Sequence, residues 1–341
     1  MPNKINIGII GRNFGYHIIY KSFIKNFNYK ITGFSFGSKK RKKITFPKNV
    51  KIYTNWKQLI LDKKITAIVI ATPPYLHKRI IKFALKNNKH IFCEKPFTSS
   101  YSEANSICKI IKRKKNISHF VNYEFSNIEA FKFFKKKIIN KIKINKIYLD
   151  WFINSNRGFK SGWKENHTKG GGIFFNYICH SIHYLEFLFG NISSVKTILT
   201  SDKEKNLRNL KGLIFFVNGL SVRLNMKVGF IKNKVEPIHS LKILSNKDNY
   251  HLVSKLNSLS DKFRLIKLNK NSNQISQILV KNKKKDEDFR IIPTLENSKK
   301  FSEWILKGKK QEPNFFNGKR IQLIIKKMLI SSKTEKNINI N

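Results

Sequence analysis

The stretch ITAIVIATPPYLHKRIIKFALKNNKHIFCEKPF, residues 65–97, decides the fold of this chain. Its first ten residues are rich in β-branched side chains and end in two prolines, which predicts a buried strand. Residues 77–88 have the spacing of a helix, and 90–96 form a second apolar strand. Two apolar strands joined by a helix predict a parallel sheet covered on both faces. Ligands of such sheets bind at the carboxyl ends of the strands, where Thr72-Pro73 and Glu94-Lys95-Pro96 lie.

The same alternation of strand and helix extends from the amino terminus to about residue 123. Strands are predicted at 5–11, 30–36 and 118–124, and helices near 17–27, 56–62 and 102–116. We therefore expect a doubly wound α/β domain over residues 1–123.

A glycine-rich turn, Gly8-Ile9-Ile10-Gly11-Arg12-Asn13-Phe14-Gly15, follows the first strand and precedes the first helix. Glycines at such a turn let the backbone approach a pyrophosphate, and the helix amino terminus supplies N–H groups and a positive dipole. The turn therefore predicts dinucleotide binding by Gly8, Gly11, Asn13, Phe14 and Gly15. The match is partial, because Asn13 replaces a second glycine and Gly15 comes one residue early. We expect Asn13 to be tolerated because Asn adopts left-handed backbone angles more readily than most residues. An ordinary strand–helix turn is the alternative.

Residues 1–61 contain no Asp or Glu. NAD-binding chains place an acid at the end of the second strand, where it binds the ribose hydroxyls. Here Gly37-Ser38-Lys39-Lys40-Arg41 follows that strand, and a small hydroxyl followed by cations suits a 2′-phosphate. We therefore assign Ser38 and Lys39 to the cofactor and favour NADP over NAD. The alternative is that these lysines belong to the basic background of the whole chain.

The Glu94-Lys95-Pro96 step predicts a working lysine. Proline favours an extended backbone at Lys95, which aims its side chain. An ammonium at the carboxyl end of a strand can hold a substrate hydroxyl and stabilise an alkoxide. Glu94 would keep the lysine oriented and charged. A surface ion pair at a strand end is the alternative.

Beyond residue 124 the pattern changes to longer strands with alternating polarity, which predicts an open, mainly antiparallel sheet. These strands are expected at 142–155, 195–201, 211–228 and 239–246, with helices at 128–141, 170–190 and 320–332. The region 254–290, rich in Lys, Asn and Ser, is expected to form loops or irregular hairpins. A second, α+β domain is therefore predicted over 124–341, with the helix at 320–332 packing back toward the first domain.

The composition is strongly basic, with 69 Lys and Arg against 20 Asp and Glu and a formal net charge of +49. The lysines are scattered and accompanied by abundant Asn, Ile and Phe, as in proteins from A+T-rich genomes, so specific nucleic-acid binding is not expected. No apolar run reaches the ~18 residues of a membrane helix, and the amino terminus lacks a signal-peptide layout. Three cysteines at no metal-type spacing favour a reduced, cytoplasmic protein.

Residues 65–97 resemble the core of the glucose–fructose oxidoreductase, inositol dehydrogenase and rhizopine-catabolism family (Gfo/Idh/MocA). That family shows a strand, Thr-Pro, a His a few residues on, a helix, and a strand ending in Glu-Lys-Pro. Here these are Thr72-Pro73, His77 and Glu94-Lys95-Pro96. The stretches SGWKENHTKGGGIFFNYICHSIHYLEFLFG (161–190) and PNFFNGKRIQLIIKKMLISS (313–332) are similar to its glycine run with substrate helix and to its closing helix. The resemblance implies a Rossmann domain followed by a substrate and oligomerisation domain.

The resemblance also implies roles for single residues. Many members carry Asp, then Gly two residues later and His four later, where this chain has Asn176, Ile178 and His180. His180 would be the acid or base, Lys95 would hold the substrate oxygen, and Asn176 would position substrate without titrating. Helical spacing would place Asn176, His180 and His183 or Tyr184 on one face. A hydrogen-bonded core histidine is the alternative for His180.

Thr72, Pro73, His77, Glu94 and Trp163 would lie near the cofactor, with His77 packing or capping and Trp163 resembling an aromatic residue beside the nicotinamide. Plain core packing is the alternative for Trp163. No metal is expected, since Cys179 and His180 are adjacent and point apart on a helix.

The expected function is transfer of hydride between NAD(P) and a hydroxyl or carbonyl of a sugar, cyclitol or nucleotide sugar by a homodimer or homotetramer. The positive surface favours an anionic substrate. Two alternatives stay open: a cofactor-binding sensor or scaffold without turnover, and NAD-dependent glycoside cleavage.

Overall fold

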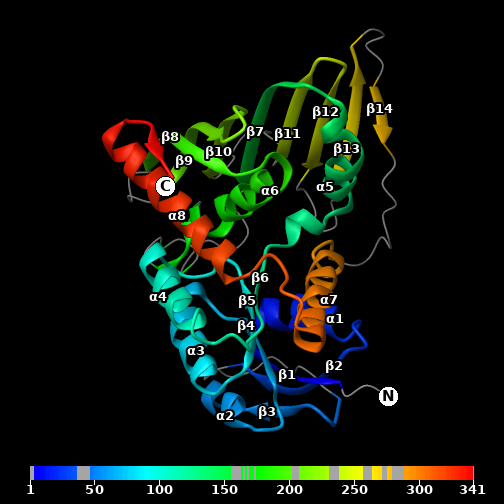
Figure 1. The fold of residues 1–341 in the computed structure, drawn as a ribbon, viewed down its shortest axis with the longest axis vertical. Helices are drawn as coiled ribbons and strands as arrows, with labels where there is room; N and C mark the ends of the chain where they lie inside the picture. The colour runs from blue at the N-terminus through cyan, green and yellow to red at the C-terminus, as the bar shows by residue number, and fades with distance from the viewer. Residues whose placement is uncertain are drawn as a thin grey trace. The chain divides into compact units, whose positions relative to one another are not determined.

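The protein forms two compact units in the computed structural model: unit 1 is Met1–Glu124 with Arg290–Gln322, and unit 2 is Phe125–Phe289 with Leu323–Asn341 (Figure 1). The structure describes residues 4–36, 47–154, 163, 166, 169–172, 174–201, 207–229, 238–255, 263–270, 275–278 and 288–340. The two units are described separately below.

Unit 1 contains a six-stranded parallel sheet with the order β3-β2-β1-β4-β5-β6. The predicted parallel sheet is confirmed, and the short edge strand β3 is an addition to the prediction. The strands are β1 Ile5–Gly11, β2 Tyr29–Ser35, β3 Lys51–Tyr53, β4 Ala67–Ala71, β5 His90–Glu94 and β6 His119–Asn122.

Helices cover both faces of this sheet. Figure 1 shows α2 (Trp56–Leu61), α3 (Pro74–Lys86) and α4 (Tyr101–Ile111) along one face, and α1 (Lys21–Phe23) with α7 (Ile291–Lys307) on the other. The helix predicted near 17–27 begins and ends earlier: helical backbone runs from Asn13 to Phe23 and includes a π-helical segment, Gly15–Tyr20, followed by α1. Helix α7 was not predicted, because its few apolar residues are spread among polar ones after a long basic stretch.

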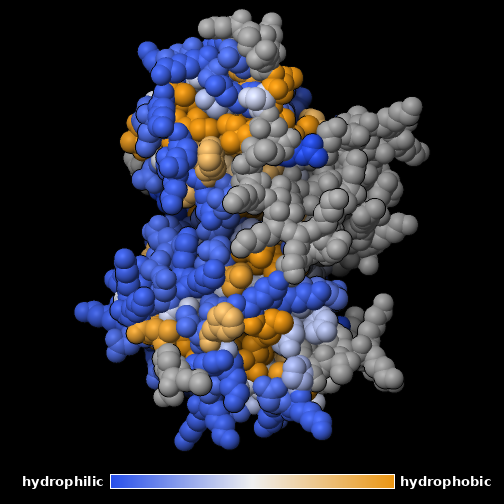
Figure 2. Space-filling model, turned by 90° about the vertical axis from the view of Figure 1, so that its right-hand side faces the viewer, coloured by the Kyte–Doolittle hydropathy of each residue, from blue (hydrophilic) through white to orange (hydrophobic). Residues whose placement is uncertain are grey.

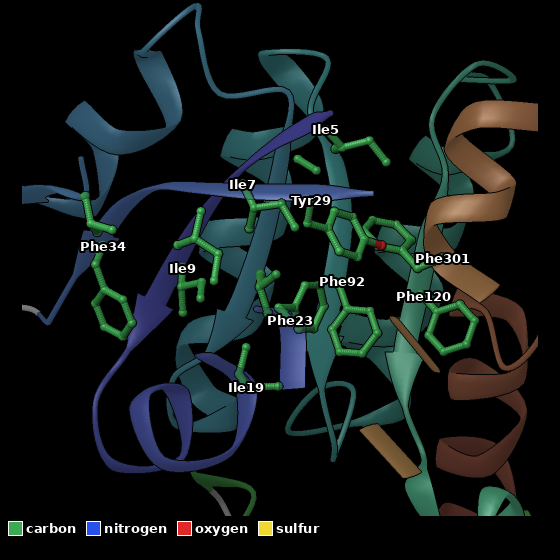
Figure 3. Packing of buried hydrophobic residues seen from close by; sticks show 14 of the residues in the cluster. Ile5, Ile7, Ile9, Ile19, Phe23, Tyr29, Phe34, Phe92, Phe120 and Phe301 are labelled. Carbon is green, nitrogen blue, oxygen red and sulfur yellow. The ribbon is translucent and has the colours of Figure 1, made fainter. Parts of the chain in front are cut away.

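The core of unit 1 explains why α7 belongs to it. Phe92 of β5 and Phe120 of β6 are fully buried and stack at 5.4 Å between ring centroids. Phe301 of α7 packs on both rings, and Phe23 of α1 meets Phe92 edge-on at 5.1 Å (Figure 3). Burying an aromatic side chain stabilises by about 1.5–3 kcal/mol, so these contacts fix α7 against the sheet although Phe301 lies far along the chain from Phe92 and Phe120.

Unit 2 contains a nine-stranded sheet with the order β14-β13-β12-β11-β7-β10-β9-β8-β15. Every neighbouring pair is antiparallel except β10 and β7, so the mainly antiparallel prediction is confirmed. The strands are β7 Ile144–Asn154, β8 Ile192–Ser201, β9 Leu207–Phe216, β10 Ser221–Gly229, β11 Ile238–Ser245, β12 Asp248–Lys255, β13 Arg264–Asn269, β14 Ile275–Ile278 and β15 Ile338–Asn339.

Two stretches of unit 2 differ from the prediction. Residues 211–228 divide into β9 and β10 at a turn through Gly219, whose φ is 84°. The region 254–290 was predicted as loops or irregular hairpins, but it contributes β13, β14 and the end of β12. Alternating buried positions such as Phe263 and Leu265 were hidden there among polar residues.

The helical segments of unit 2 also depart from simple α-helices. Residues 128–141, predicted as one helix, form α5 (Glu129–Phe133), then a π-helical and a 3₁₀ segment. Residues 170–190 contain a π-helical segment, Phe174–Ile178, followed by α6 (Cys179–Phe189). Helix α8 (Phe315–Thr334) begins in unit 1 and continues into unit 2.

The face drawn in Figure 2 carries many hydrophilic side chains, with smaller hydrophobic patches among them. Among the residues that the structure describes, no helix combines the length and apolar character needed to cross a membrane.

Candidate functional site

Four neighbouring strands of unit 1, β2, β1, β4 and β5, end at one edge of the parallel sheet. The glycine turn follows β1, Thr72 and Pro73 follow β4, and Lys95 follows β5. The structure therefore brings together, at one carboxyl edge, three segments that the sequence assigned to a ligand.

Gly11 is required by its surroundings. Its φ is +150°, and a Cβ placed there would lie 2.3 Å from the carbonyl oxygen of Ala71. The next residue begins the helix, since the Tyr16 amide donates to the Arg12 carbonyl oxygen at 2.7 Å. Only a residue without a side chain lets β1 turn this closely beside β4 and enter a helix at once.

The other residues of the predicted turn have different surroundings. Gly8 lies inside β1, where a Cβ would be 2.4 Å from Leu59 of α2, so its absence of a side chain makes room for helix packing. Asn13 and Phe14 lie in the first helical turn, ahead of Gly15. Asn13 is helical, so the expected use of a left-handed conformation is wrong. A first helical turn presents N–H groups that the helix itself does not use, which suits an anion.

Thr72 supplies a polar group with no use inside the fold. Its Oγ1 is buried and has no hydrogen-bond partner among the described residues. Buried hydroxyls are usually paired. A hydroxyl of this kind, beside a glycine turn and a lysine, fits a bound nucleotide.

His77 joins the two segments that follow β4 and β5. Its Nε2 lies 2.8 Å from the Thr72 carbonyl oxygen, and its Nδ1 lies 3.1 Å from the Phe97 carbonyl oxygen. The ring is fully buried, and desolvation lowers its pKa. In the neutral ring only one nitrogen donates, and the shorter contact favours Nε2–H. His77 thus contacts both the Thr72 segment and the Phe97 segment, and its packing role beside the cofactor stays a prediction.

Lys95 is half-buried and directly follows Glu94, the last residue of β5. The segment after it is anchored: the Phe97 ring packs on Phe315 at 4.5 Å, and Gln322 Nε2 donates to the Thr98 carbonyl oxygen at 2.8 Å. These contacts hold the backbone beyond the lysine in place.

Glu94 is buried, with 5% of its surface exposed, and accepts a hydrogen bond from Asn122 Nδ2 at 2.6 Å. Asn122 in turn contacts Thr294 and Asn297 of α7, at 3.2 and 2.9 Å. Burial, and then the charge of Glu124, raise the pKa of Glu94 to about 8, while the hydrogen bond from Asn122 and the charge of Lys95 oppose this. The carboxyl group therefore belongs to a buried polar network, not to a surface ion pair.

This network was missed in the sequence. Thr294 and Asn297 lie in a helix that had not been predicted, and nothing in the local pattern around them points to β6. Polar residues that recur on the buried side of an amphipathic helix could have indicated this network, because buried polar groups need hydrogen-bond partners.

In unit 2, His180 lies in the first turn of α6 and is 4% exposed, with its ring 4.5 Å from that of Phe125. Asn176 lies in the preceding π-helical segment and is half-buried. A π-helical turn holds more residues than an α-helical turn. The α-helical spacing that placed Asn176, His180 and a residue at 183 or 184 on one face therefore does not apply across this junction.

A second histidine, His239 of β11, lies in the same unit and was missed in the sequence. It stacks on Trp151 of β7 at 3.8 Å, and its Nε2 lies 2.8 Å from Tyr184 Oη. His239 and Trp151 are directly paired in the register of β11 and β7. A His within an alternating strand was the available signal, since inward positions of that strand are buried.

The remaining predicted residues are only partly placed. Trp163 is half-buried in a turn of unit 2, where its carbonyl oxygen accepts from the Asn166 amide. Ser38 and Lys39 lie outside the described residues. Within the described ranges, no three His, Cys, Asp or Glu side chains are close enough together to hold a metal ion.

The parallel sheet, the glycine turn and the lysine at the end of β5 define a nucleotide-binding Rossmann domain, joined to a second domain with a mixed sheet. Two family models match this chain: "Oxidoreductase family, NAD-binding Rossmann fold" over residues 5–123, and "GFO/IDH/MocA C-terminal domain" over residues 136–236. The chain belongs to the Gfo/Idh/MocA family of oxidoreductases and has its NAD(P)-binding Rossmann fold.

Individual relatives agree with this placement. The chain is 31% identical over 159 residues to an uncharacterised oxidoreductase of Schizosaccharomyces pombe, a match covering 46% of this chain and 43% of the relative. It is 30% identical over 156 residues to levoglucosan dehydrogenase of Pseudarthrobacter phenanthrenivorans, covering 43% and 39%. The matches thus span less than half of these curated relatives. A solved structure of levoglucosan dehydrogenase with NADH and levoglucosan shares the fold, with a TM-score of 0.79, 17% identity, and coverage of 99% of this chain and 100% of that one.

Proposed function

We propose that this protein transfers hydride between NADP(H) and a hydroxyl or carbonyl carbon of a sugar, cyclitol or nucleotide sugar. The observation that carries the proposal is the carboxyl edge of unit 1, where the glycine turn, the unused Thr72 hydroxyl and Lys95 end neighbouring strands. The name of the relative that acts on levoglucosan supports a sugar-like substrate. The absence of acids from residues 1–61 and the cations at 39–41 support NADP.

The chain's own residues divide the work as follows. The first helical turn after Gly11 and the Thr72 hydroxyl hold the nucleotide, whose nicotinamide, when bound, supplies or accepts the hydride. The Lys95 ammonium holds the reacting substrate oxygen and stabilises negative charge on it. His180 takes or returns the proton of that oxygen, and Asn176 orients the substrate without titrating. Lys95 and His180 come from different units.

The proposal includes a homo-oligomer. Ile198 of β8 and Leu213 of β9 are 61% and 37% exposed on one face of the unit 2 sheet, beside Lys196 and Lys211. Exposed apolar side chains on an open sheet face suit contact with a second copy. The buried thiols of Cys93, Cys108 and Cys179, which form no disulfide, suit the cytoplasmic location predicted from the sequence.

The test uses Lys95→Ala, with the exposed Lys82→Ala of α3 as the control that removes one equal charge from unit 1. Turnover is measured from nicotinamide absorbance over a panel of sugars, cyclitols and nucleotide sugars, and cofactor affinity is measured separately. We expect Lys95→Ala to lose about 100- to 1,000-fold in turnover while cofactor affinity stays within about tenfold. Lys82→Ala should behave like the wild type.

The alternatives give other outcomes in the same experiment. A sensor or scaffold binds nucleotide and turns over no compound of the panel. An NAD-dependent glycosidase cleaves aryl glycosides only when nucleotide is bound. Loss of cofactor affinity in Lys95→Ala beyond about tenfold would place the lysine in cofactor binding and remove the catalytic role proposed for it.

A further inference from the structure

Arg12 connects the glycine turn to the end of the neighbouring strand β2. It directly follows Gly11, and its Nε donates a hydrogen bond to the Phe36 carbonyl oxygen at 2.8 Å. Phe36 is the first residue after β2 and is buried, with its ring stacked on Phe34 at 4.4 Å. The acceptor is therefore held firmly, and the guanidinium group is held at the carboxyl end of β2.

That strand end is the part of a dinucleotide fold that meets the adenosine ribose. In NAD-binding chains an acid there binds the 2′-hydroxyl, whereas an arginine nearby accommodates a 2′-phosphate. The first acid of this chain, Asp62, lies between α2 and the amino end of β4, and it accepts hydrogen bonds from Tyr53 Oη and the Lys64 amide. The acid that NAD recognition needs is absent from the preceding sequence, and the Arg12 guanidinium is hydrogen-bonded at the end of β2.

From this geometry we propose that Arg12 selects NADP(H) over NAD(H) by binding the 2′-phosphate of the adenosine ribose. With Nε held by the Phe36 carbonyl oxygen, Nη1 and Nη2 form the end of the group that can present two parallel donors to phosphate oxygens. The inference rests on the proposed function, because it concerns the nucleotide of the same site. It assigns the cofactor choice to a residue of the turn itself.

A second arginine, Arg290, also lies near the glycine turn and could contribute to nucleotide binding. Arg290, at the start of α7, lies over the Phe14 ring at 5.2 Å. It contributes positive charge near the first helical turn, where its guanidinium lies over Phe14. Arg290→Ala is therefore expected to weaken NADPH and NADH together, without changing the preference.

The experiment titrates NADPH and NADH separately into the wild type, Arg12→Ala, Arg12→Lys and Arg79→Ala. Arg79 stacks over Trp56 elsewhere in unit 1, so its variant matches the change in charge. We expect Arg12→Ala to bind NADPH about 10- to 100-fold more weakly, as for a lost charge-assisted hydrogen bond, and NADH within about threefold of the wild type. Arg12→Lys keeps a positive charge but loses the forked donors of the guanidinium group, so its affinity for NADPH is expected to lie between those of the wild type and Arg12→Ala. Arg79→Ala should change neither affinity.

Competition with 2′,5′-ADP and 5′-AMP gives an independent measurement, since these fragments differ only in the 2′-phosphate. Arg12→Ala should weaken binding of the fragment that carries the 2′-phosphate and leave binding of the other fragment unchanged. If Arg12→Ala does not fold, Arg12→Lys carries the comparison, with its melting temperature measured alongside. An equal loss of affinity for NADPH and NADH in the Arg12 variants would overturn the assignment and leave the proposed function intact. A wild type that prefers NADH would overturn the assignment and the choice of NADP in the proposed function, but not the proposed hydride transfer. A wild type that binds neither nucleotide would overturn both.

Discussion

Replacing Glu94 by glutamine turns a buried carboxyl group into a neutral amide of nearly the same shape. The Asn122 Nδ2 donor that lies 2.6 Å from the carboxyl oxygen keeps an acceptor in Glu94→Gln. The folded protein raises the pKa of Glu94 from 4.5 to about 8, mainly by burial and then by the charge of Glu124. The substitution therefore removes a titration while leaving the hydrogen-bond network in place.

The sign of the effect follows from proton binding. The folded carboxyl group binds a proton more tightly than the unfolded one, so its folding advantage is complete below about pH 4.5 and is lost as pH rises to about 8. A rise from 4.5 to about 8 corresponds to about 5 kcal/mol at 1.36 kcal/mol per pH unit. Glu94→Gln should match the wild type in stability near pH 5 and exceed it by about 3–5 kcal/mol near pH 9.

Hydrogen exchange of the backbone amides of β5 and β6, followed by mass spectrometry, measures this locally and does not require the two units to unfold together. At one pH the intrinsic exchange rate of those amides is the same in both proteins, so the ratio of protection gives the difference in free energy. Glu296→Gln, a half-exposed carboxylate of α7 paired with Lys299, is the control and should leave the pH dependence unchanged. Protection that changes in parallel for Glu94→Gln and the wild type across this pH range would refute the reasoning.

Two further substitutions test the packing around the sites. Gly11→Ala should cost more than about 3 kcal/mol, because its Cβ would lie 2.3 Å from the Ala71 carbonyl oxygen. Gly308→Ala is the control: its φ is also positive, but nothing lies within 4 Å of the added atom, so it should cost only about 1 kcal/mol. Both costs are measured by urea unfolding, and equal losses of stability in the two variants would contradict the predicted clash. Tyr184→Phe should destabilise unit 2 by about 1–3 kcal/mol, because it leaves His239 Nε2 buried without its partner at 2.8 Å. Unchanged amide protection in β11 would show that this hydrogen bond contributes nothing.

Much of the fold was accessible from local pattern. Strands buried on both faces are apolar almost throughout, so β1, β4 and β5 were recognisable and their order of strand and helix implied a parallel sheet. Residues that follow such strands must meet at one edge, which placed Thr72 and Lys95 near the glycine turn.

Other features depend on partners distant in the chain. Helix α7 is polar enough to escape notice, and the ring of Phe301 fixes it against β5 and β6 only in the folded state. The π-helical turn before α6 changes the spacing between Asn176 and His180, and no periodicity in the sequence predicted it.

The alternation of strands and helices, the glycine turn and the position of the lysine at a strand end could therefore be predicted from residues that are neighbours in sequence, because backbone conformation and the side of burial follow local polarity. The protonation state of Glu94 could not be predicted in this way. Its proton affinity depends first on burial and then on the charge of Glu124, and it is opposed by the hydrogen bond from Asn122, which in turn contacts α7 residues 172 and 175 positions further along the chain. Desolvation and hydrogen bonding act through space, so the chemical character of a buried group is a property of the folded structure.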